Sequence, residues 1–146
     1  MERHYTLYSI KAEVANFFYG REGKFVQLFL ECEQAEGRKL DILKRQVTYI
    51  LEPVPNLQIQ RELHKLVQDI GGTRKGQGVY LQDRDFRWHA TIRWTNELLT
   101  IDVYGEEEEV DSLLFERLRK VDNFLAIERS CSRYGWLKPR KQQKYV

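Results

Sequence analysis

The amino-acid sequence predicts an α+β domain, in which an antiparallel or mixed sheet of about five strands packs with about four to five helices. Some stretches alternate apolar and polar residues, as half-buried strands do, whereas others repeat apolar residues every three or four positions, as helices do. The stretches are joined by short turns, with no internal repeat and no separating linker. We therefore expect a single domain over residues 1–146.

The first half contains one predicted strand followed by four predicted helices. In residues 3–10, Tyr5 and Leu7 face one side and His4, Thr6 and Tyr8 the other, which is typical of a strand. Apolar residues then recur at helical spacing in residues 10–20, 24–32, 39–51 and 59–70. Glycines follow the first and last of these helices, and a proline pair ends the one at 39–51.

The second half is predicted mainly as strands. Residues 79–81, 88–94 and 99–103 form successive strands, and the last two are joined by a tight turn. A helix begins at the run of glutamates at 106–109, where the helix dipole favours negative charge, and a last strand covers 124–128. The glycine-rich stretch 71–78 has no phosphate-loop pattern, so we expect a flexible surface loop there.

Three consecutive aromatic residues close the helix predicted at 10–20. Successive helical residues turn by about 100°, so Phe17, Phe18 and Tyr19 together span about 200°. A core-facing stripe is only somewhat wider than about 100°. Either the rest of the domain encloses this helix, or its aromatic side faces a partner, and composition alone leaves both open.

The helix predicted at 39–51 carries two apolar rows. The main row, which includes Leu43 and Val47, is continuous and should face the core. A second row, Ile42, Gln46 and Tyr49, is offset from it. Apolar anchors around one hydrogen-bonding amide suit a recognition surface, but the same row would also suit the solvated margin of a core.

Composition excludes several classes of protein. The 146 residues are 42% hydrophobic and 32% charged with a net charge of +2, which is typical of a folded protein without a general attraction to nucleic acid or membranes. No apolar run approaches the ~20 residues that span a bilayer. The N-terminus lacks the pattern of a signal peptide, and Cys32 and Cys131 are far apart, so we expect a cytoplasmic protein with reduced thiols.

Recognisable catalytic chemistry is missing. His4, His64 and His89 lie on different predicted elements without metal or triad spacing, and no nucleophile elbow or dinucleotide fingerprint occurs. We therefore expect a protein that is not an enzyme and has no cofactor or metal. In residues 129–146, six cations interleave with Tyr134, Trp136 and Tyr145, which indicates either a nucleic-acid-binding segment or a plug of rings packed on the sheet.

Several short motifs resemble the SirA family, the sporulation inhibitors of replication of endospore-forming bacteria. They are Met1-Glu-Arg-His-Tyr5, Ala15-Asn16, Tyr19-Gly-Arg-Glu22, Val121 with Phe124-Leu-Ala126, and Arg133-Tyr-Gly-Trp-Leu137 with Pro139. The resemblance implies binding to the N-terminal domain of the replication initiator DnaA, a helical interaction module. It also implies that initiation is inhibited as cells commit to sporulation.

The resemblance further implies a contact surface on the first helix and on the helix before the proline pair. In this sequence the corresponding positions are Val14, Phe18, Gln46 and Tyr49. Gln46 and Tyr49 match the family pattern, whereas Val14 and Phe18 stand where larger or hydroxyl-bearing aromatics occur.

The aromatic helix and the offset row converge on the same positions. We therefore expect a partner-binding patch of Val14, Phe17, Phe18, Gln46 and Tyr49, provided that the two helices lie side by side. The expected partner is the DnaA N-terminal domain, with no direct contact to nucleic acid, membrane or a small-molecule substrate. The alternative is a small nucleic-acid-binding module that uses the basic C-terminal segment, and an enzyme of unrecognised type comes third.

Overall fold

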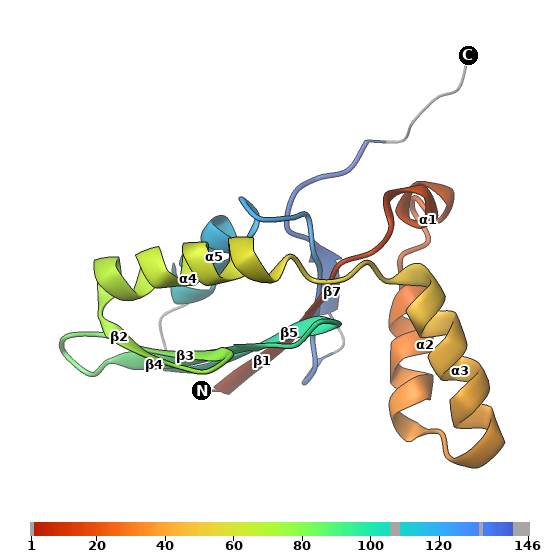
Figure 1. Ribbon diagram of the computed structural model, residues 1–146, viewed down its shortest axis with the longest axis horizontal. Coiled ribbons are helices and arrows are strands. Elements are labelled where there is room, and N and C mark those ends of the chain that lie inside the picture. Colours follow the sequence, from red (N-terminus) through yellow and green to blue (C-terminus); the bar gives the residue numbers. More distant parts are fainter. Residues whose placement is uncertain (1, 106–108, 132, 142–146) are drawn as a thin grey trace.

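The computed structural model describes residues 2–105, 109–131 and 133–141, which form one antiparallel sheet and five helices (Figure 1). The elements are β1 (Glu2–Tyr8), α1 (Ala12–Phe17), α2 (Gly23–Gln34), α3 (Gly37–Ile50), α4 (Asn56–Ile70), β2 (Gly72–Lys75), β3 (Gly78–Gln82), β4 (Trp88–Trp94), β5 (Leu98–Gly105), α5 (Glu109–Leu118), β6 (Leu125–Glu128) and β7 (Arg133–Trp136). The strand order is β2-β3-β4-β5-β1-β6-β7. The predicted α+β class is therefore confirmed.

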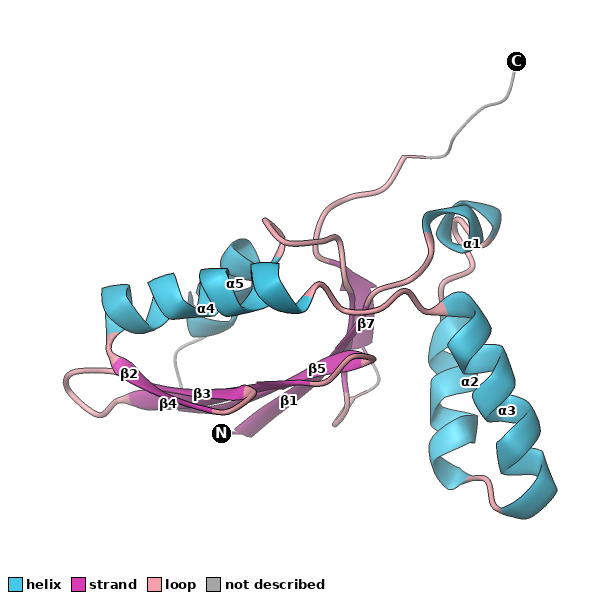
Figure 2. Cartoon of the chain, in the orientation of Figure 1, coloured by secondary structure: helices cyan, strands magenta, loops and turns pink. Residues whose placement is uncertain are grey.

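Two helical layers use the sheet differently (Figure 2). α4 and α5 lie along one face of the sheet, whereas the α2–α3 hairpin projects from one end of it. β1 joins the two regions, because it pairs with β5 on one side and with β6 on the other. Its alternating side chains therefore supply both hydrophobic clusters of the protein.

The larger cluster lies between the sheet and the α4–α5 layer. The inward residues of β4 are Trp88, Ala90, Ile92 and Trp94, as the alternating pattern predicted. α4 and α5 add apolar stripes at helical spacing that close the cluster from above. We call this cluster the sheet core; its most completely buried members include Leu7, Ile59, Leu63, Leu66, Leu81, Ile92, Trp94, Leu99, Ile101, Leu114, Leu118 and Phe124.

The smaller cluster lies on the opposite face of β1 and β6, where α2 covers the sheet. Tyr8 points to this face and stacks on Phe29 of α2, with ring centroids 3.9 Å apart. Burial raises the pKa of Tyr8 to about 12. We call this the helical cluster; it consists of Tyr8, Ile10, Ala15, Phe25, Val26, Phe29, Ile50, Leu51, Leu125 and Ile127.

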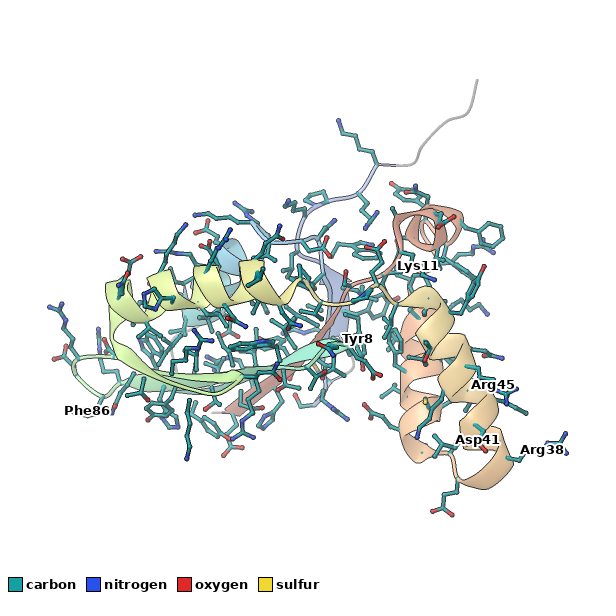
Figure 3. The ribbon with its side chains drawn as sticks, in the orientation of Figure 1. Tyr8, Lys11, Arg38, Asp41, Arg45 and Phe86 are labelled. Atoms are coloured by element: carbon teal, nitrogen blue, oxygen red, sulfur yellow. The ribbon has the colours of Figure 1, made fainter. Side chains whose placement is uncertain are left out.

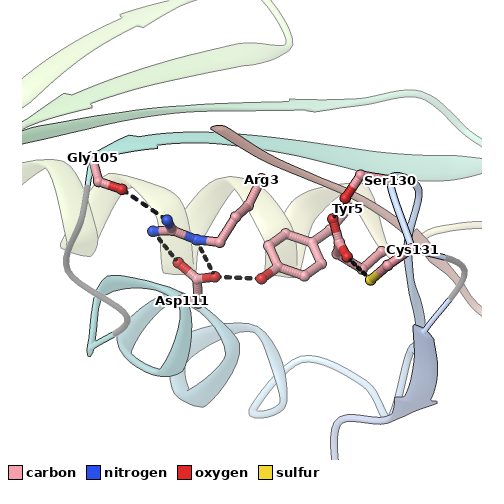
Figure 4. Close-up of polar contacts among 7 residues, drawn as sticks. Arg3, Tyr5, Gly105, Asp111, Ser130 and Cys131 are labelled. Carbon is pink, nitrogen blue, oxygen red and sulfur yellow. Dashed lines mark hydrogen bonds and ion pairs between the residues drawn. The ribbon is translucent and has the colours of Figure 1, made fainter. Parts of the chain in front are cut away.

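A polar network fastens α5 to the first strand (Figure 4). The Arg3 guanidinium donates two hydrogen bonds to the Asp111 carboxylate, at 2.7 and 2.9 Å, and a third to the Gly105 carbonyl at 2.8 Å. The Tyr5 hydroxyl also donates to Asp111, and burial raises the pKa of Tyr5. Such a bidentate, partly buried pair is among the stronger polar contacts in proteins.

A second polar cluster closes the end of β6. Ser130 and Cys131 both donate to the Glu128 carboxylate, and these bonds, with that of Cys131 first, lower the pKa of Glu128 (Figure 4). Cys32 and Cys131 are both free thiols.

The prediction of about five strands was too low, and one missed strand lies in the supposed glycine-rich loop. β2 pairs with β3 through Gly72 opposite Leu81, so most of this stretch is a hairpin. A Cβ at Gly72 would lie 2.2 Å from the Tyr80 carbonyl oxygen, so glycine permits a close backbone approach there. Glycine weakens the sequence signal of a strand, which explains the error.

The other missed strand is β7, which pairs with β6 at the edge of the sheet. The interpretation of its rings as a plug packed on the sheet was only partly right. Trp136 is half-buried against the helical cluster, but Tyr134 is 50% exposed. Tyr134 and Trp136 are two residues apart and therefore share one face of this strand, but only Trp136 packs against the helical cluster.

The remaining predicted bounds shifted slightly. β1 ends at Tyr8, and Ile10 instead forms an isolated bridge with Leu51. α5 is described from Glu109 onward, so the predicted helix start at 106–108 lies outside the described residues.

Candidate protein-interaction groove

α1 is held directly beside the end of α3. The backbone N–H of Lys11 donates to the Ile50 carbonyl at 2.9 Å, and the N–H of Glu52 donates to the Ser9 carbonyl at 2.8 Å. These bonds flank the bridge between Ile10 and Leu51. The two helices that the patch prediction required to be neighbours are therefore neighbours.

α1 is short and ends within the aromatic run. Its last residue is Phe17, and the N–H of Phe18 still donates to the Val14 carbonyl, at 3.1 Å. Arg21 then closes the turn, because its N–H donates to the Phe18 carbonyl at 2.7 Å and its guanidinium donates to the Phe17 carbonyl at 2.9 Å. Gly20 adopts a positive φ of 79° in this turn, a conformation that glycine readily adopts.

The three aromatic side chains diverge from this turn. Phe17 is 70% exposed, and Tyr19 is also exposed. Phe18 is half-buried, with its ring edge-on to Phe25 at 5.1 Å between centroids. The prediction that one helix face cannot bury all three rings is confirmed, because only Phe18 contacts the helical cluster.

The exposed side of α1 and the adjacent side of α3 enclose a groove of about 700 Å³. Apolar and aromatic side chains from α1, α2 and α3 form most of its wall. It is lined by Lys11, Glu13, Val14, Phe17, Phe18, Leu28, Arg45, Gln46, Tyr49 and Ile50. All five residues of the predicted patch therefore line one groove, which we call the aromatic groove.

The offset row of α3 lies outside the hydrophobic clusters. Ile42 and Gln46 are exposed, and Tyr49 is 71% exposed. The core-facing residues Leu43 and Ile50 of the same helix are buried, which confirms the main stripe. Ile42 does not line the groove, so the row runs from the groove outward along α3.

Cations rest on the rings that border the groove. The Lys11 ammonium lies 4.9 Å from the centre of the Tyr49 ring, and the Arg21 guanidinium lies 5.5 Å from that of Phe17 and 5.2 Å from that of Phe18. Such contacts orient the rings and keep positive charge at the rim. Glu13 is the one acidic residue that lines the groove.

The chemistry of the groove suits the docking of another protein. Its lining offers rings, aliphatic side chains and the Gln46 amide, and the described residues that line it include no histidine, cysteine, serine or threonine. Among the residues that the structure describes, no group of three or more His, Cys, Asp or Glu side chains could hold a metal ion. An open apolar groove with a few polar groups suits a side chain of another protein.

Sequence reasoning did not include five of the residues that line the groove, which are Lys11, Glu13, Leu28, Arg45 and Ile50. The signal for Arg45 was available, because it precedes Gln46 and lies four residues before Tyr49 on one helix. Lys11 could not be placed, since its position depends on the bonds between α1 and the end of α3.

The basic C-terminal segment is partly engaged within the fold. Arg129 donates to Glu33 at 2.6 Å, and the Arg140 guanidinium lies 4.2 Å from the centre of the Trp136 ring. The Trp136 indole donates to Glu22 at 3.2 Å. Lys144 and Tyr145 lie outside the described residues. Within the described residues, no helix has the length and apolarity needed to cross a bilayer.

Comparison with known proteins agrees with the motifs at both ends of the chain. The family model described as sporulation inhibitor of replication protein SirA matches residues 3–141. The sporulation inhibitor of replication protein SirA of Bacillus subtilis (strain 168) is 33% identical over 150 residues, and the match covers 100% of both chains. The chain therefore belongs to the SirA family.

Proposed function

We propose that this protein inhibits the initiation of chromosome replication during sporulation by binding the N-terminal domain of DnaA through the aromatic groove. Family membership and the name of the Bacillus subtilis relative support the role in replication control. The observation that carries the site is the convergence of Val14, Phe17, Phe18, Gln46 and Tyr49 on one groove. The choice of DnaA as partner rests on the resemblance of these positions to the family pattern.

Inhibition by this route needs no catalysis. An apolar side chain of the partner would fill the groove between α1 and α3, and the Gln46 amide would fix its orientation through a hydrogen bond. Exposed Phe17 and Tyr49 lose apolar surface to water on docking, so they should contribute most of the binding energy. Occupying the initiator domain in this way would block its productive assembly.

The nucleic-acid alternative has less support. It needs cations and rings that are free to contact phosphates and bases. Arg129 is paired with Glu33, and the Trp136 ring is covered on one side by Arg140. Tyr134 keeps an exposed ring, so one element of that alternative remains.

Calorimetric titration of the full chain with the isolated N-terminal domain of DnaA tests the proposal. We expect saturable binding by the wild type, weakened by Phe17→Ala and unchanged by Phe86→Ala. Phe86 is a suitable control because it is 77% exposed, lies in the loop between β3 and β4 and does not line the groove.

Gel-shift titration with random duplex DNA completes the test. We expect only weak association that disappears at physiological salt. Tight DNA binding together with no detectable binding to the initiator domain would overturn the proposed function and favour the C-terminal segment.

A further inference from the structure

The outer face of α3 extends the aromatic groove away from α1. Arg38, Ile42, Arg45 and Tyr49 follow at spacings of four, three and four residues, so they form one row along the helix. All four side chains are exposed. In Figure 3 the side chains of Arg38 and Arg45 project outward from the α2–α3 hairpin, away from the sheet. We call this row the α3 strip.

The two arginines of the strip, Arg38 and Arg45, form no ion pair with any other residue that the structure describes. Asp41 lies between them at helical spacing, yet forms no ion pair with either. In contrast, Arg3 and Arg129 each contact a carboxylate within 2.7 Å.

Positive charge also predominates where the strip meets the groove. Lys11 and Arg45 both line the groove, and Arg21 lies over the rings of α1. Among the described residues that line the groove, Glu13 is the only acid, so this part of the rim carries a net positive charge. An exposed guanidinium is a planar donor that matches a carboxylate with two parallel hydrogen bonds.

We propose that the occupant of this surface is an acidic helix of the partner, which lies along α3 with an apolar side chain in the groove and carboxylates facing Arg45 and Arg38. This inference rests on the proposed function and adds the charge and direction of the docked surface. Arg38 and Arg45 are separated by seven residues, or about 10 Å along the helix. The matching carboxylates should therefore lie about two turns apart on the partner helix.

The charged part of the surface should act mainly on the rate of association. Complementary charges accelerate diffusional encounter, and salt screens them, whereas an apolar anchor acts mainly on dissociation. Kinetic measurements can therefore distinguish the contribution of the two arginines from that of the apolar anchor. Arg38 offers the cleaner test, because it does not line the groove and its replacement leaves the anchor site intact.

The experiment compares charge-reversal variants of the full chain, Arg38→Glu, Arg45→Glu and the double variant, with Arg61→Glu as the matched control. Arg61 is exposed on α4 and, among the described residues, also lacks an ion pair, so its reversal changes the net charge as much as either single reversal does, but at a remote place. Stopped-flow association with the DnaA N-terminal domain is measured across a salt series. Thermal melting of each variant checks the fold.

We expect the double variant to associate about tenfold more slowly at low salt, with a flatter salt dependence, and Arg61→Glu to stay within about twofold of the wild type. An equal loss in all variants, Arg61→Glu included, would mean a general charge effect and overturn the inference. Wild-type rates for all the Arg38 and Arg45 variants, with binding still weakened in Tyr49→Ala, would overturn the role of the two arginines and leave the proposed function standing. Absence of any binding by the wild type would overturn both.

Discussion

The sheet core and the helical cluster differ in how completely they are closed. The sheet core is covered by the strands on one side and by α4 and α5 on the other, and most of its large side chains have no measurable exposure. The helical cluster is closed by α2 and the end of α3, and four of its neighbours, Val14, Phe18, Leu28 and Val47, stay half-buried. Three of these four line the aromatic groove.

The two clusters therefore differ in how much apolar surface they use for stability and how much they leave for recognition. Apolar surface that is fully buried on folding contributes to the stability of the fold, whereas half-buried and exposed apolar surface remains available for a partner. The six-residue α1 contributes a single buried side chain, that of Ala15. Its position therefore depends on backbone bonds to α3 and on the turn at Arg21, and its rings remain available for docking.

Truncation of a side chain in the sheet core should lower the stability of the fold more than truncation beside the helical cluster. Ile92 is fully buried on the interior strand β4, so Ile92→Ala should lower the free energy of unfolding by about 2–5 kcal/mol. The matched change beside the helical cluster, Leu28→Ala, should cost less than half as much, because Leu28 is only half-buried against that cluster. Urea denaturation measures both, and equal costs would mean that the two clusters do not differ in stability.

Truncation of Trp136 on the edge strand β7 should lower the stability of the fold by an intermediate amount. Trp136 is half-buried, so Trp136→Ala should cost about 2 kcal/mol, less than for a fully buried tryptophan. Trp136→Phe retains the ring but loses the hydrogen bond to Glu22, which should cost about 1 kcal/mol. Thermal melting with affinity measurements on both variants would show whether β7 supports α1 through Glu22. A Trp136→Ala protein that melts like the wild type but no longer binds would move the interface to the C-terminal segment.

His4 lies on the open face of the sheet. Its titration should change the stability of the fold by less than the substitutions above. The hydrogen bond with Asp102, at 2.6 Å, is the first cause that raises the pKa of His4 above its ordinary value of 6.5. A raised pKa in the folded state means that the contribution is complete below pH 6.5 and is lost as the pH rises through the folded pKa. The melting temperature should therefore fall as the pH rises above 6.5. The decrease should be small, because this pair is partly exposed.

Asp102→Asn is the control for this dependence, since it removes the carboxylate and keeps the side-chain shape. We expect a flatter profile in this variant. The same pH profile in both proteins would mean that another group titrates.

The sequence allowed most of the fold to be predicted, because long periodic patterns report which face of an element is buried. The alternation of apolar and polar residues predicted β4, and apolar residues at helical spacing predicted α4. Neither prediction needed knowledge of tertiary contacts. The strands β2 and β7 were missed, since each has four residues and contains glycine. Such strands form because a neighbouring strand pairs with them, and their own sequences show no clear alternating pattern.

The candidate site was predictable where it depended on local geometry. Phe17 could be identified as excess apolar surface on its helix, and the offset row of α3 indicated Gln46 and Tyr49, which the family resemblance also selected. Their convergence was not predictable, because it depends on the backbone bonds between Lys11 and Ile50 and between Ser9 and Glu52. Arg38 and Arg45 were not considered, because only the structure shows that neither forms an ion pair with another described residue.

The central claim is that the aromatic groove serves recognition and not stability, and Tyr49 tests it most directly. Calorimetric titration of Tyr49→Ala and Gln46→Ala with the DnaA N-terminal domain is combined with melting curves, with Phe86→Ala as control. Tyr49 is largely exposed, so unfolding should change by less than about 0.5 kcal/mol, while binding should weaken by about 2 kcal/mol and by less for Gln46→Ala. Wild-type affinity in both groove variants would contradict the claim, because the partner would then dock elsewhere.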